Sequence, residues 1–295
     1  IMLTSLLILS QNLHCLNYQK HSKKSWDTIL LVKVTSNMKN KNALVCGSSK
    51  GIGASTAIEL SKLGASITLL ARDEESLSDI LNKLDTSNSQ KHSYLIVDFD
   101  NPNKLKNTIN DFVKVSPIIH ILINNSGGPK PGPIVSANIE DFIGAFNRHL
   151  VCNHILVQAL VPNMKKVNFG RIINITSTSV KEPIKGLGIS NTIRGAVANW
   201  AKTLSFELGE FGITVNNILP GYTDTQRLQE IFLSKSKKNN FDIESVISDA
   251  HSQIPLGRFA DPKETAKAIC FLASEDASYI NGINLPVDGG RLSTL

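Results

Sequence analysis

From Ala43 onward, short apolar runs rich in β-branched residues alternate with longer amphipathic stretches, whereas residues 1–37 show no clean period. Short apolar runs are typical of buried strands, and apolar positions recurring every three to four residues are typical of helices that cover a sheet. The expected strands are Ala43–Cys46, Ser66–Leu70, Ser93–Val97, Ile119–Ile123, Arg171–Ile175, Thr214–Ile218 and Gly282–Val287. The expected helices lie near Ala54–Lys62, Glu75–Leu84, Pro102–Val115, Ile139–Val167, Asn191–Phe211 and Pro262–Ser274.

This alternation predicts an α/β fold, with a single doubly wound Rossmann-type domain built on a seven-stranded parallel sheet. We expect the domain to span residues 38–295, because Met38 directly precedes the polar stretch Lys39–Asn42 and the first strand. Residues 1–37 are then an N-terminal extension outside the fold. Residues 226–255 form a polar insertion before the last helix. Two interpretations of it stay open, a substrate lid and a solvated surface loop.

The distribution of charge bears on which partners the protein binds, whereas its overall composition does not. The 295 residues are 41% apolar and 19% charged, which is ordinary for a globular protein. The formal net charge is +6, and half of it falls in residues 1–37. No Lys/Arg cluster lies beside interleaved aromatic residues, so we expect no nucleic-acid partner. No apolar run reaches the ~18 residues that span a bilayer, and the cysteines lack metal-ligand spacing. We therefore expect a cytoplasmic protein without a membrane partner or a metal.

A glycine-rich loop joins the first strand to the first helix and reads Gly47-Ser48-Ser49-Lys50-Gly51-Ile52-Gly53. Glycine permits a tight turn and lets backbone N–H groups approach a pyrophosphate at the positive end of a helix. Its place between a strand and a helix predicts a dinucleotide site. The candidate cofactor-binding residues of this loop are Gly47, Ser49, Lys50, Gly51, Ile52 and Gly53.

The end of the second strand indicates which dinucleotide is bound. A site for NAD places an acidic residue here for the ribose 2′-hydroxyl, whereas NADP needs a cation for its 2′-phosphate. Ala71 stands where the acid would be, and Arg72 and Lys50 supply two cations. The sequence predicts NADP(H) in preference to NAD(H). The alternative is that both cations are solvated surface charges.

Further motifs resemble the short-chain dehydrogenase/reductase family from about Lys41 to the C-terminus. Asn124-Asn125-Ser126-Gly127 is similar to the family's Asn-Asn-Ala-Gly motif, and Pro220–Thr225 is similar to its nicotinamide loop. Leu285–Gly290 resembles the C-terminal strand through which members commonly pack into tetramers. The resemblance implies a homo-oligomer, either a tetramer or a dimer. It also implies cofactor contacts at Asp98, Asn125, Ser126, Gly127, Pro220, Gly221, Thr223 and Thr225.

The family's catalytic residues are an Asn, a Ser, and a Tyr and a Lys four positions apart. Ser177 matches the Ser that polarises the carbonyl oxygen. Ser190 stands where the Tyr is expected, and Arg194 stands where the Lys is expected. A serine hydroxyl is far too weak an acid to replace a phenol, and Arg stays protonated. The chain is therefore identified as a divergent member without the Tyr–Lys pair, in which Arg194 can still hold the cofactor ribose.

His149 stands where the family has its Asn, counting either back from Pro162 or forward from Phe142. Histidine titrates near neutrality, so His149 is a candidate general acid, with a packed structural histidine as the alternative. Tyr222 is a second candidate acid, with an aromatic wall for the substrate as its alternative. The candidate catalytic residues are Ser177, His149, Ser190 and Arg194.

Two functions fit these residues. The resemblance implies an NADP(H)-dependent oxidoreductase that acts on a small-molecule carbonyl or secondary alcohol, similar to 3-oxoacyl reductases or to sugar and alcohol dehydrogenases. The alternative is a catalytically impaired protein of the same fold that binds the nucleotide as a sensor or scaffold. General acid catalysis contributes ~10²–10⁴-fold, so a member without the Tyr can be slow and still active. This argument favours the enzyme.

Overall fold

The computed structural model describes residues 37–294, so the expected N-terminal extension lies outside the described residues except for its last position. Seven parallel strands form one sheet in the order β3-β2-β1-β4-β5-β6-β7. They are β1 (Asn42–Cys46), β2 (Ser66–Ala71), β3 (Ser93–Ile96), β4 (Ile121–Asn124), β5 (Gly170–Ile175), β6 (Ile213–Pro220) and β7 (Asn284–Val287). The prediction of a doubly wound, seven-stranded parallel sheet is confirmed.

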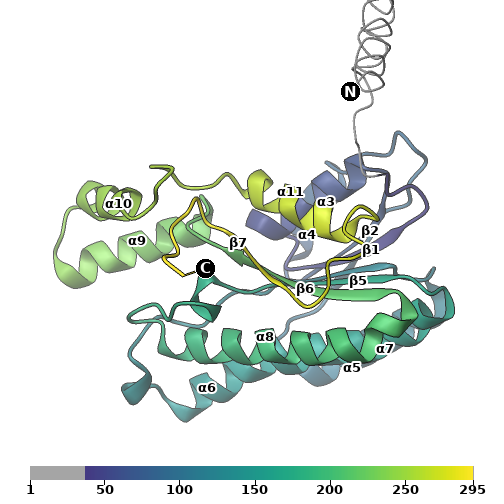
Figure 1. Cartoon of the computed structure of the whole chain (residues 1–295), viewed down its shortest axis with the longest axis horizontal. Coiled ribbons are helices and arrows are strands. Elements are labelled where there is room, and N and C mark those ends of the chain that lie inside the picture. The colour runs from purple at the N-terminus through teal and green to yellow at the C-terminus, as the bar shows by residue number, and fades with distance from the viewer. Residues whose placement is uncertain (1–36, 295) are drawn as a thin grey trace, which may run out of the picture. The chain divides into compact units, whose positions relative to one another are not determined.

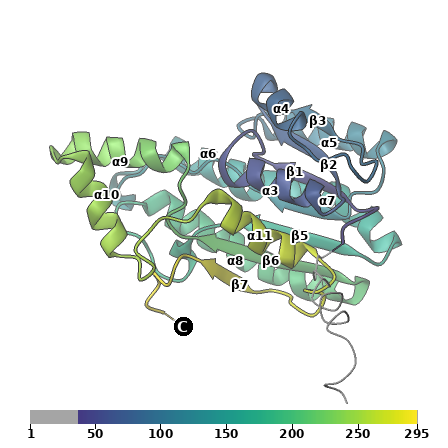
Figure 2. The same ribbon diagram turned by 90° about the horizontal axis from the view of Figure 1, so that it is seen from above.

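Helices cover both faces of the sheet (Figures 1 and 2). One face carries α3 (Gly51–Lys62), α4 (Glu74–Leu81) and α11 (Pro262–Ala273), and the other carries α5 (Pro102–Val115), α7 (Cys152–Lys166) and α8 (Gly188–Leu208). Within β1, Ala43 and Val45 pack in the first layer, whereas Leu44 and Cys46 pack in the second. Both faces of the strand are buried, which explains why the strands read as continuous apolar runs.

The predicted helix Ile139–Val167 is two helices, α6 (Ile139–Phe146) and α7, joined by the π-helical segment η2 (Asn147–Val151). A π-helical turn is rare, and hydrophobic periodicity does not reveal it. His149 lies in the middle of this segment and is only 1% exposed. The predicted helical stretch is therefore confirmed, but its π-helical middle, where a candidate catalytic residue lies, was not predicted.

The insertion at 226–255 folds into two helices, α9 (Gln226–Asn239) and α10 (Ile243–Ser252), at one end of the sheet (Figure 2). Thr225 caps α9 by accepting from the backbone N–H of Leu228, and Asp242 caps α10 in the same manner. The two helices share a small apolar cluster of Leu228, Phe232, Val246 and Ala250. The insertion is therefore helical over most of its length rather than an irregular loop. Among the described residues, no helix combines the length and apolar character that crossing a bilayer requires.

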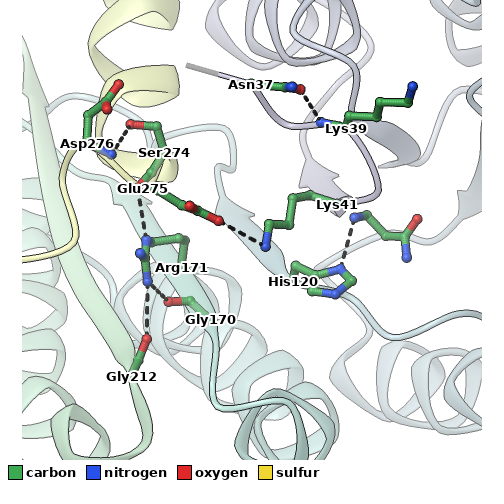
Figure 3. Close-up of polar contacts among 11 residues, drawn as sticks. Asn37, Lys39, Lys41, His120, Gly170, Arg171, Gly212, Ser274, Glu275 and Asp276 are labelled. Atoms are coloured by element: carbon green, nitrogen blue, oxygen red, sulfur yellow. Dashed lines mark hydrogen bonds and ion pairs between the residues drawn. The ribbon is translucent and has the colours of Figure 1, made fainter. Parts of the chain in front are cut away.

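At the amino-terminal edge of the sheet, a buried arginine ties β5 to its neighbours (Figure 3). Arg171 donates to the carbonyl oxygens of Ser274 at 3.2 Å, Gly170 at 2.9 Å and Gly212 at 3.2 Å. Nearby, Lys41 forms a 3.3 Å ion pair with Glu275. The Arg171 charge is thus met by three carbonyl dipoles, which is how a buried guanidinium avoids the cost of unpaired burial.

A ladder of hydrogen-bonded asparagine side chains crosses the four strands from β4 to β7. Asn124, Asn174, Asn217 and Asn284 occupy directly paired positions on β4, β5, β6 and β7. Each side-chain Nδ2 donates to the Oδ1 of the next Asn, at 2.8, 2.9 and 2.8 Å. Buried amides are costly unless they are paired. The hydrogen bonds therefore favour this register of the four strands over any other.

We predict that Asn174→Ala lowers the free energy of unfolding by about 2–4 kcal/mol, because it leaves a buried donor on Asn124 and a buried acceptor on Asn217 without a partner. Urea unfolding measures this change. Asn110→Ala, on the exposed face of α5, is the matched control and should change stability by less than about 0.5 kcal/mol. Equal effects of the two substitutions would contradict the role of the ladder.

Candidate active site

The glycine-rich loop lies where β1 is flanked by β2 and β4, the point at which the strand order reverses. Gly47 and Gly51 have φ of 57° and 58°, a region that L side chains rarely adopt. A Cβ on Gly53 would lie 2.2 Å from the Gly47 carbonyl oxygen. The first turn of α3 carries no acidic residue. The loop therefore offers free N–H groups at a helix N-terminus, which fits the pyrophosphate of a dinucleotide.

The two predicted phosphate-binding cations lie at the ends of β1 and β2. Lys50 is exposed, and its Nζ donates to Oε1 of Gln226 at 3.1 Å. Arg72 is 73% exposed and lies 3.7 Å from Asp98. Neither cation is tied to a buried structural partner among the described residues, so both remain accessible to a 2′-phosphate. The strand β2 itself ends in Ala71 instead of the acidic residue that would bind a 2′-hydroxyl.

The other predicted cofactor residues lie along the same carboxyl edge of the sheet. Asn125 donates from Nδ2 to the Gly47 carbonyl oxygen at 3.1 Å and so joins the loop after β4 to the glycine loop. Gly221 packs so closely on the last strand segment that a Cβ would lie 2.7 Å from the Cα of Asp288. Beyond these, the edge carries Ser49, Ile52, Asp98, Ser126, Gly127, Pro220, Thr223 and Thr225.

Ser177 and Arg194 lie at the carboxyl end of β5. Ser177 begins the short helix η3 (Thr178–Val180), and its Oγ accepts from the backbone N–H of Ser179 at 3.1 Å. Arg194 lies on α8 and donates from Nη1 to the Ile175 carbonyl oxygen at 2.7 Å. Burial lowers the pKa of Arg194 to about 10, so it remains a cation at neutral pH. Ser190, half-buried, precedes Arg194 by one turn and shares its face of α8.

His149 forms a contact that sequence reasoning missed. Its Nδ1 lies 2.6 Å from the Oγ of Ser126, whereas its buried Nε2 has no partner. Burial, together with the charges of Arg194 and Arg148, holds the pKa of His149 well below its usual range. The ring is therefore neutral at pH 7. The sequence signal that could have indicated this contact is Ser126, which stands where the family motif has alanine.

Tyr222 lies in an aromatic cluster. Its ring centroid is 5.9 Å from that of Phe232 and 5.8 Å from that of Phe259. The guanidinium of Arg291 lies over the Tyr222 ring, 4.7 Å from its centroid. These packing contacts agree with an aromatic wall and give Tyr222 no sign of a role as the acid.

A cleft of about 530 Å³ lies near the candidate site, and none of the four candidate catalytic residues lines it. It is lined by the Gly128–Pro133 loop, by the start of α6, and by Arg148, Ile189 and Arg227. Arg148 and Ile189 are the chain neighbours of His149 and Ser190. The cleft therefore reaches the elements that hold two of the candidate catalytic residues, and its size suits a small molecule.

Known proteins resemble this chain in sequence and in fold. A model of the family described as enoyl-(acyl carrier protein) reductase matches residues 47–291. The NADPH-dependent reductase BacG of Bacillus subtilis (strain 168) is 30% identical over 261 residues, covering 88% of this chain and 100% of BacG. The 3-oxoacyl-[acyl-carrier-protein] reductase FabG of Haemophilus influenzae is 31% identical over 253 residues, covering 86% and 98%.

A solved structure gives the same assignment. The crystal structure of L-sorbose reductase from Gluconobacter frateurii, complexed with NADPH and L-sorbose, matches with a TM-score of 0.83 at 30% identity. The match covers 88% of this chain and 100% of that reductase. The chain belongs to the short-chain dehydrogenase/reductase family. The family resemblance read from the motifs is confirmed.

We predict that the stability of the protein falls as the pH drops below about 6.5, in part because of His149. Its pKa is lower in the native state than in the unfolded chain, so the unfolded chain binds a proton that the native state does not. The resulting slope is up to about 1.4 kcal/mol per pH unit and vanishes at higher pH, where the ring is neutral in both states. His149→Asn should reduce the slope measured by urea unfolding between pH 5 and 7.

Two other histidines complete the comparison. Burial and Lys41 also lower the pKa of His120, so the His149→Asn variant should keep a smaller slope of the same sign. His154 is exposed on α7, and His154→Asn should leave the wild-type slope intact. An unchanged slope in His149→Asn would show that His149 is not held neutral.

Proposed function

We propose that the protein is an NADP(H)-dependent oxidoreductase that interconverts a small-molecule carbonyl and the corresponding secondary alcohol. One observation carries this proposal. The carboxyl edge of a single sheet presents a glycine cradle with two accessible cations beside Ser177, Arg194 and a buried His149. The glycine cradle and its two cations suit a phosphorylated dinucleotide. Ser177, Arg194 and His149 suit a reacting oxygen.

The cofactor is NADP(H) in preference to NAD(H). Arg72 and Lys50 supply the positive charge for a 2′-phosphate, and Ala71 replaces the acid that would select the 2′-hydroxyl. Two of the relatives agree with this choice, since BacG is named NADPH-dependent and the sorbose reductase was crystallised with NADPH. Gly47, Gly51 and the N-terminus of α3 would hold the pyrophosphate.

The chain's own residues divide the chemistry among them. When bound, NADPH supplies the hydride that is transferred to the carbonyl carbon. Ser177 donates a hydrogen bond that polarises the carbonyl oxygen, and Ser190 is a second hydroxyl on the neighbouring helix. Arg194 holds the ribose hydroxyls and places a positive charge near the oxygen that gains negative charge. In this divergent member, these residues take the place of the Tyr–Lys pair.

The proton that completes the alcohol comes from water or through His149. A neutral imidazole is not the strong acid that an imidazolium is, so His149 would act by passing on a proton or by donating a hydrogen bond. The contact available for this is between Nδ1 and the Ser126 hydroxyl, because Nε2 is buried and has no partner. We therefore propose that His149 relays a proton and does not act as the general acid itself.

The proposals for the substrate class and the oligomeric state rest on the relatives. FabG is named a 3-oxoacyl-[acyl-carrier-protein] reductase and the sorbose reductase acts on a sugar, so the substrate is 3-oxoacyl-like or sugar-like. We further propose a homo-oligomer, tetramer or dimer, in the cytoplasm. The folded domain then spans residues 38–295, residues 1–37 are an extension, and α9 with α10 form a lid over the substrate.

We predict that Arg72→Ala raises the KM for NADPH by about 10- to 100-fold, because a charge-assisted contact with the 2′-phosphate is lost. The KM for NADH should change little, since NADH lacks that phosphate. Steady-state kinetics with both cofactors measures the two values. Lys106→Ala, at an exposed position on α5, is the control and should change neither. Equal effects of Arg72→Ala on both cofactors would refute the assignment.

We predict NADPH oxidation with at least one member of a panel of ketones, aldehydes, quinones, acyl-thioester analogues and sugars. Ser177→Ala should lower kcat by about 10²-fold, the usual cost of losing a donor to a developing oxyanion. His149→Ala should lower kcat and shift its pH profile. NADPH binding by calorimetry without turnover on any member of the panel, unchanged in Ser177→Ala, would instead support a nucleotide-binding sensor or scaffold.

A further inference from the structure

The cleft near the candidate site has a polar lining. Five charged side chains line it, and they come from the loop after β4, from α6, from η2 and from α9: Lys130, Glu140, Asp141, Arg148 and Arg227. Among the described residues of the lining, Ile189 is the one large aliphatic side chain, and none is aromatic. Since α6 and α9 lie at the same end of the sheet (Figures 1 and 2), a ligand in the cleft meets charged groups from more than one element.

Three of these charged groups are free to bind a ligand. Lys130, Glu140 and Asp141 are exposed, and within residues 37–294 their side chains take part in no hydrogen bond or ion pair. An ammonium group only donates hydrogen bonds, and a carboxylate only accepts them. The cleft therefore offers both kinds of hydrogen-bond partner to a bound molecule.

Arg148 adds a donor whose position is fixed. Its Nε donates to Oδ1 of Asp100 at 2.7 Å, and its Nη2 donates to the same oxygen. These two bonds hold the guanidinium in place at the wall of the cleft. The remaining nitrogen, Nη1, makes no hydrogen bond within the part of the chain that the structure describes, so it is available to a ligand.

The cleft carries little net charge. Arg148 forms its ion pair with Asp100, and Nη1 of Arg227 lies 3.6 Å from a carboxylate oxygen of Glu230. The lysine of the lining is accompanied by the two acids at the start of α6. This balance selects strongly for neither an anion nor a cation, and it suits a neutral molecule that forms many hydrogen bonds.

An apolar pocket near α9 is separate from the cleft. This second pocket, of about 500 Å³, is lined in part by Leu228, Phe232 and Phe259, and it shares no lining residue with the cleft. Arg227 lines the cleft, whereas the next residue, Leu228, lines the pocket, so the two spaces meet different sides of α9. A long alkyl chain in the cleft would lie against charged side chains and remove them from water, which is unfavourable.

The wall of the cleft is held in place without a ligand. The backbone N–H of Gly132 donates to the Gly186 carbonyl oxygen at 2.7 Å, and the backbone N–H of Gly188 donates to the Gly132 carbonyl oxygen at 3.0 Å. Three of the six residues in the loop 128–133 are proline, which restricts the backbone further. A wall fixed in advance loses less conformational entropy when it binds a ligand.

We propose that the cleft binds the hydroxyl-bearing part of a short polyhydroxylated carbonyl compound, and that Lys130 and Glu140 determine this specificity. A hydroxyl group both donates and accepts hydrogen bonds, so a row of hydroxyls is matched by a wall that holds ammonium and carboxylate groups together. This inference rests on the proposed function. It selects the sugar-like substrate class over the 3-oxoacyl class, a choice that the proposed function leaves open.

Two ketones with the same carbon chain test the proposal. Erythrulose carries a hydroxyl group on every carbon except that of the carbonyl, whereas butanone carries none. A third probe, 3-oxooctanoyl-N-acetylcysteamine, represents the 3-oxoacyl class. Saturation-transfer difference NMR on the enzyme loaded with NADP⁺ measures the dissociation constants and needs no turnover. Erythrulose should bind about 10- to 100-fold more tightly than butanone, and more tightly than the thioester.

Methionine substitutions remove one polar group from the cleft while keeping a long side chain. Lys130→Met and Glu140→Met should each lower the affinity for erythrulose by about 5- to 10-fold and leave the affinity for NADP⁺ unchanged. Lys130→Gln, which keeps a donor without the charge, should retain part of the affinity. Lys106→Met, at an exposed position of α5 outside the cleft, is the matched control and should change the affinity for no probe. In steady-state kinetics, both cleft variants should raise KM for erythrulose more than they lower kcat.

Each contrary result has a distinct meaning. Equal binding of erythrulose and butanone, or a preference for erythrulose that persists in both methionine variants, would overturn the proposal. Tighter binding of the thioester would overturn it in favour of the 3-oxoacyl class. Reduction of butanone or of the thioester without a preference for erythrulose would leave the oxidoreductase function standing. A preference that depends on Lys130 and Glu140, without turnover of any probe, would support the cleft assignment and count against the oxidoreductase function.

Discussion

Four asparagine side chains, hydrogen-bonded in register across β4, β5, β6 and β7, lie directly beneath the candidate active site. The site residues leave their strands shortly after the ladder, with Ser126 two residues beyond Asn124 and Ser177 three beyond Asn174. A one-residue slip of any strand would turn its asparagine to the other face and leave buried amides unpaired, at about 1–3 kcal/mol for each group. Hydrogen bonds within the sheet therefore set the relative positions of the loops that carry the candidate site residues.

The charges above that ladder favour negative ligands. Arg194 is a cation at neutral pH that donates to a backbone carbonyl oxygen, and burial lowers its pKa to about 10. A cation kept in a low-dielectric place is costly unless something compensates it during function. The N-terminus of α3 adds a partial positive charge at the glycine loop. The same edge thus suits both a pyrophosphate and an oxygen that becomes negative during the reaction.

The sheet and the cofactor loop were predictable because their signals are local. Strands buried on both faces read as apolar runs, and β1 and β2 lie within one residue of their predicted ends. The π-helical segment around His149 has no such signal, since it changes neither composition nor the spacing of apolar residues enough to be seen. The contact between His149 and Ser126 joins positions 23 apart and depends on how α6 and α7 pack.

On the proposed function, His149, Ser190 and Arg194 form a chemically consistent set. Without a phenol at 190, a lysine at 194 would have no hydroxyl pKa to lower, and an arginine serves as a permanent charge instead. That charge stabilises an alkoxide and, with burial, keeps His149 neutral and weakly basic. An alkoxide formed by hydride transfer then needs only a proton from water, whereas the reverse reaction needs a base to remove the proton of the alcohol. Neither Ser190 nor a histidine of lowered pKa is a strong base at neutral pH. The arrangement therefore suits reduction of a carbonyl better than oxidation of an alcohol.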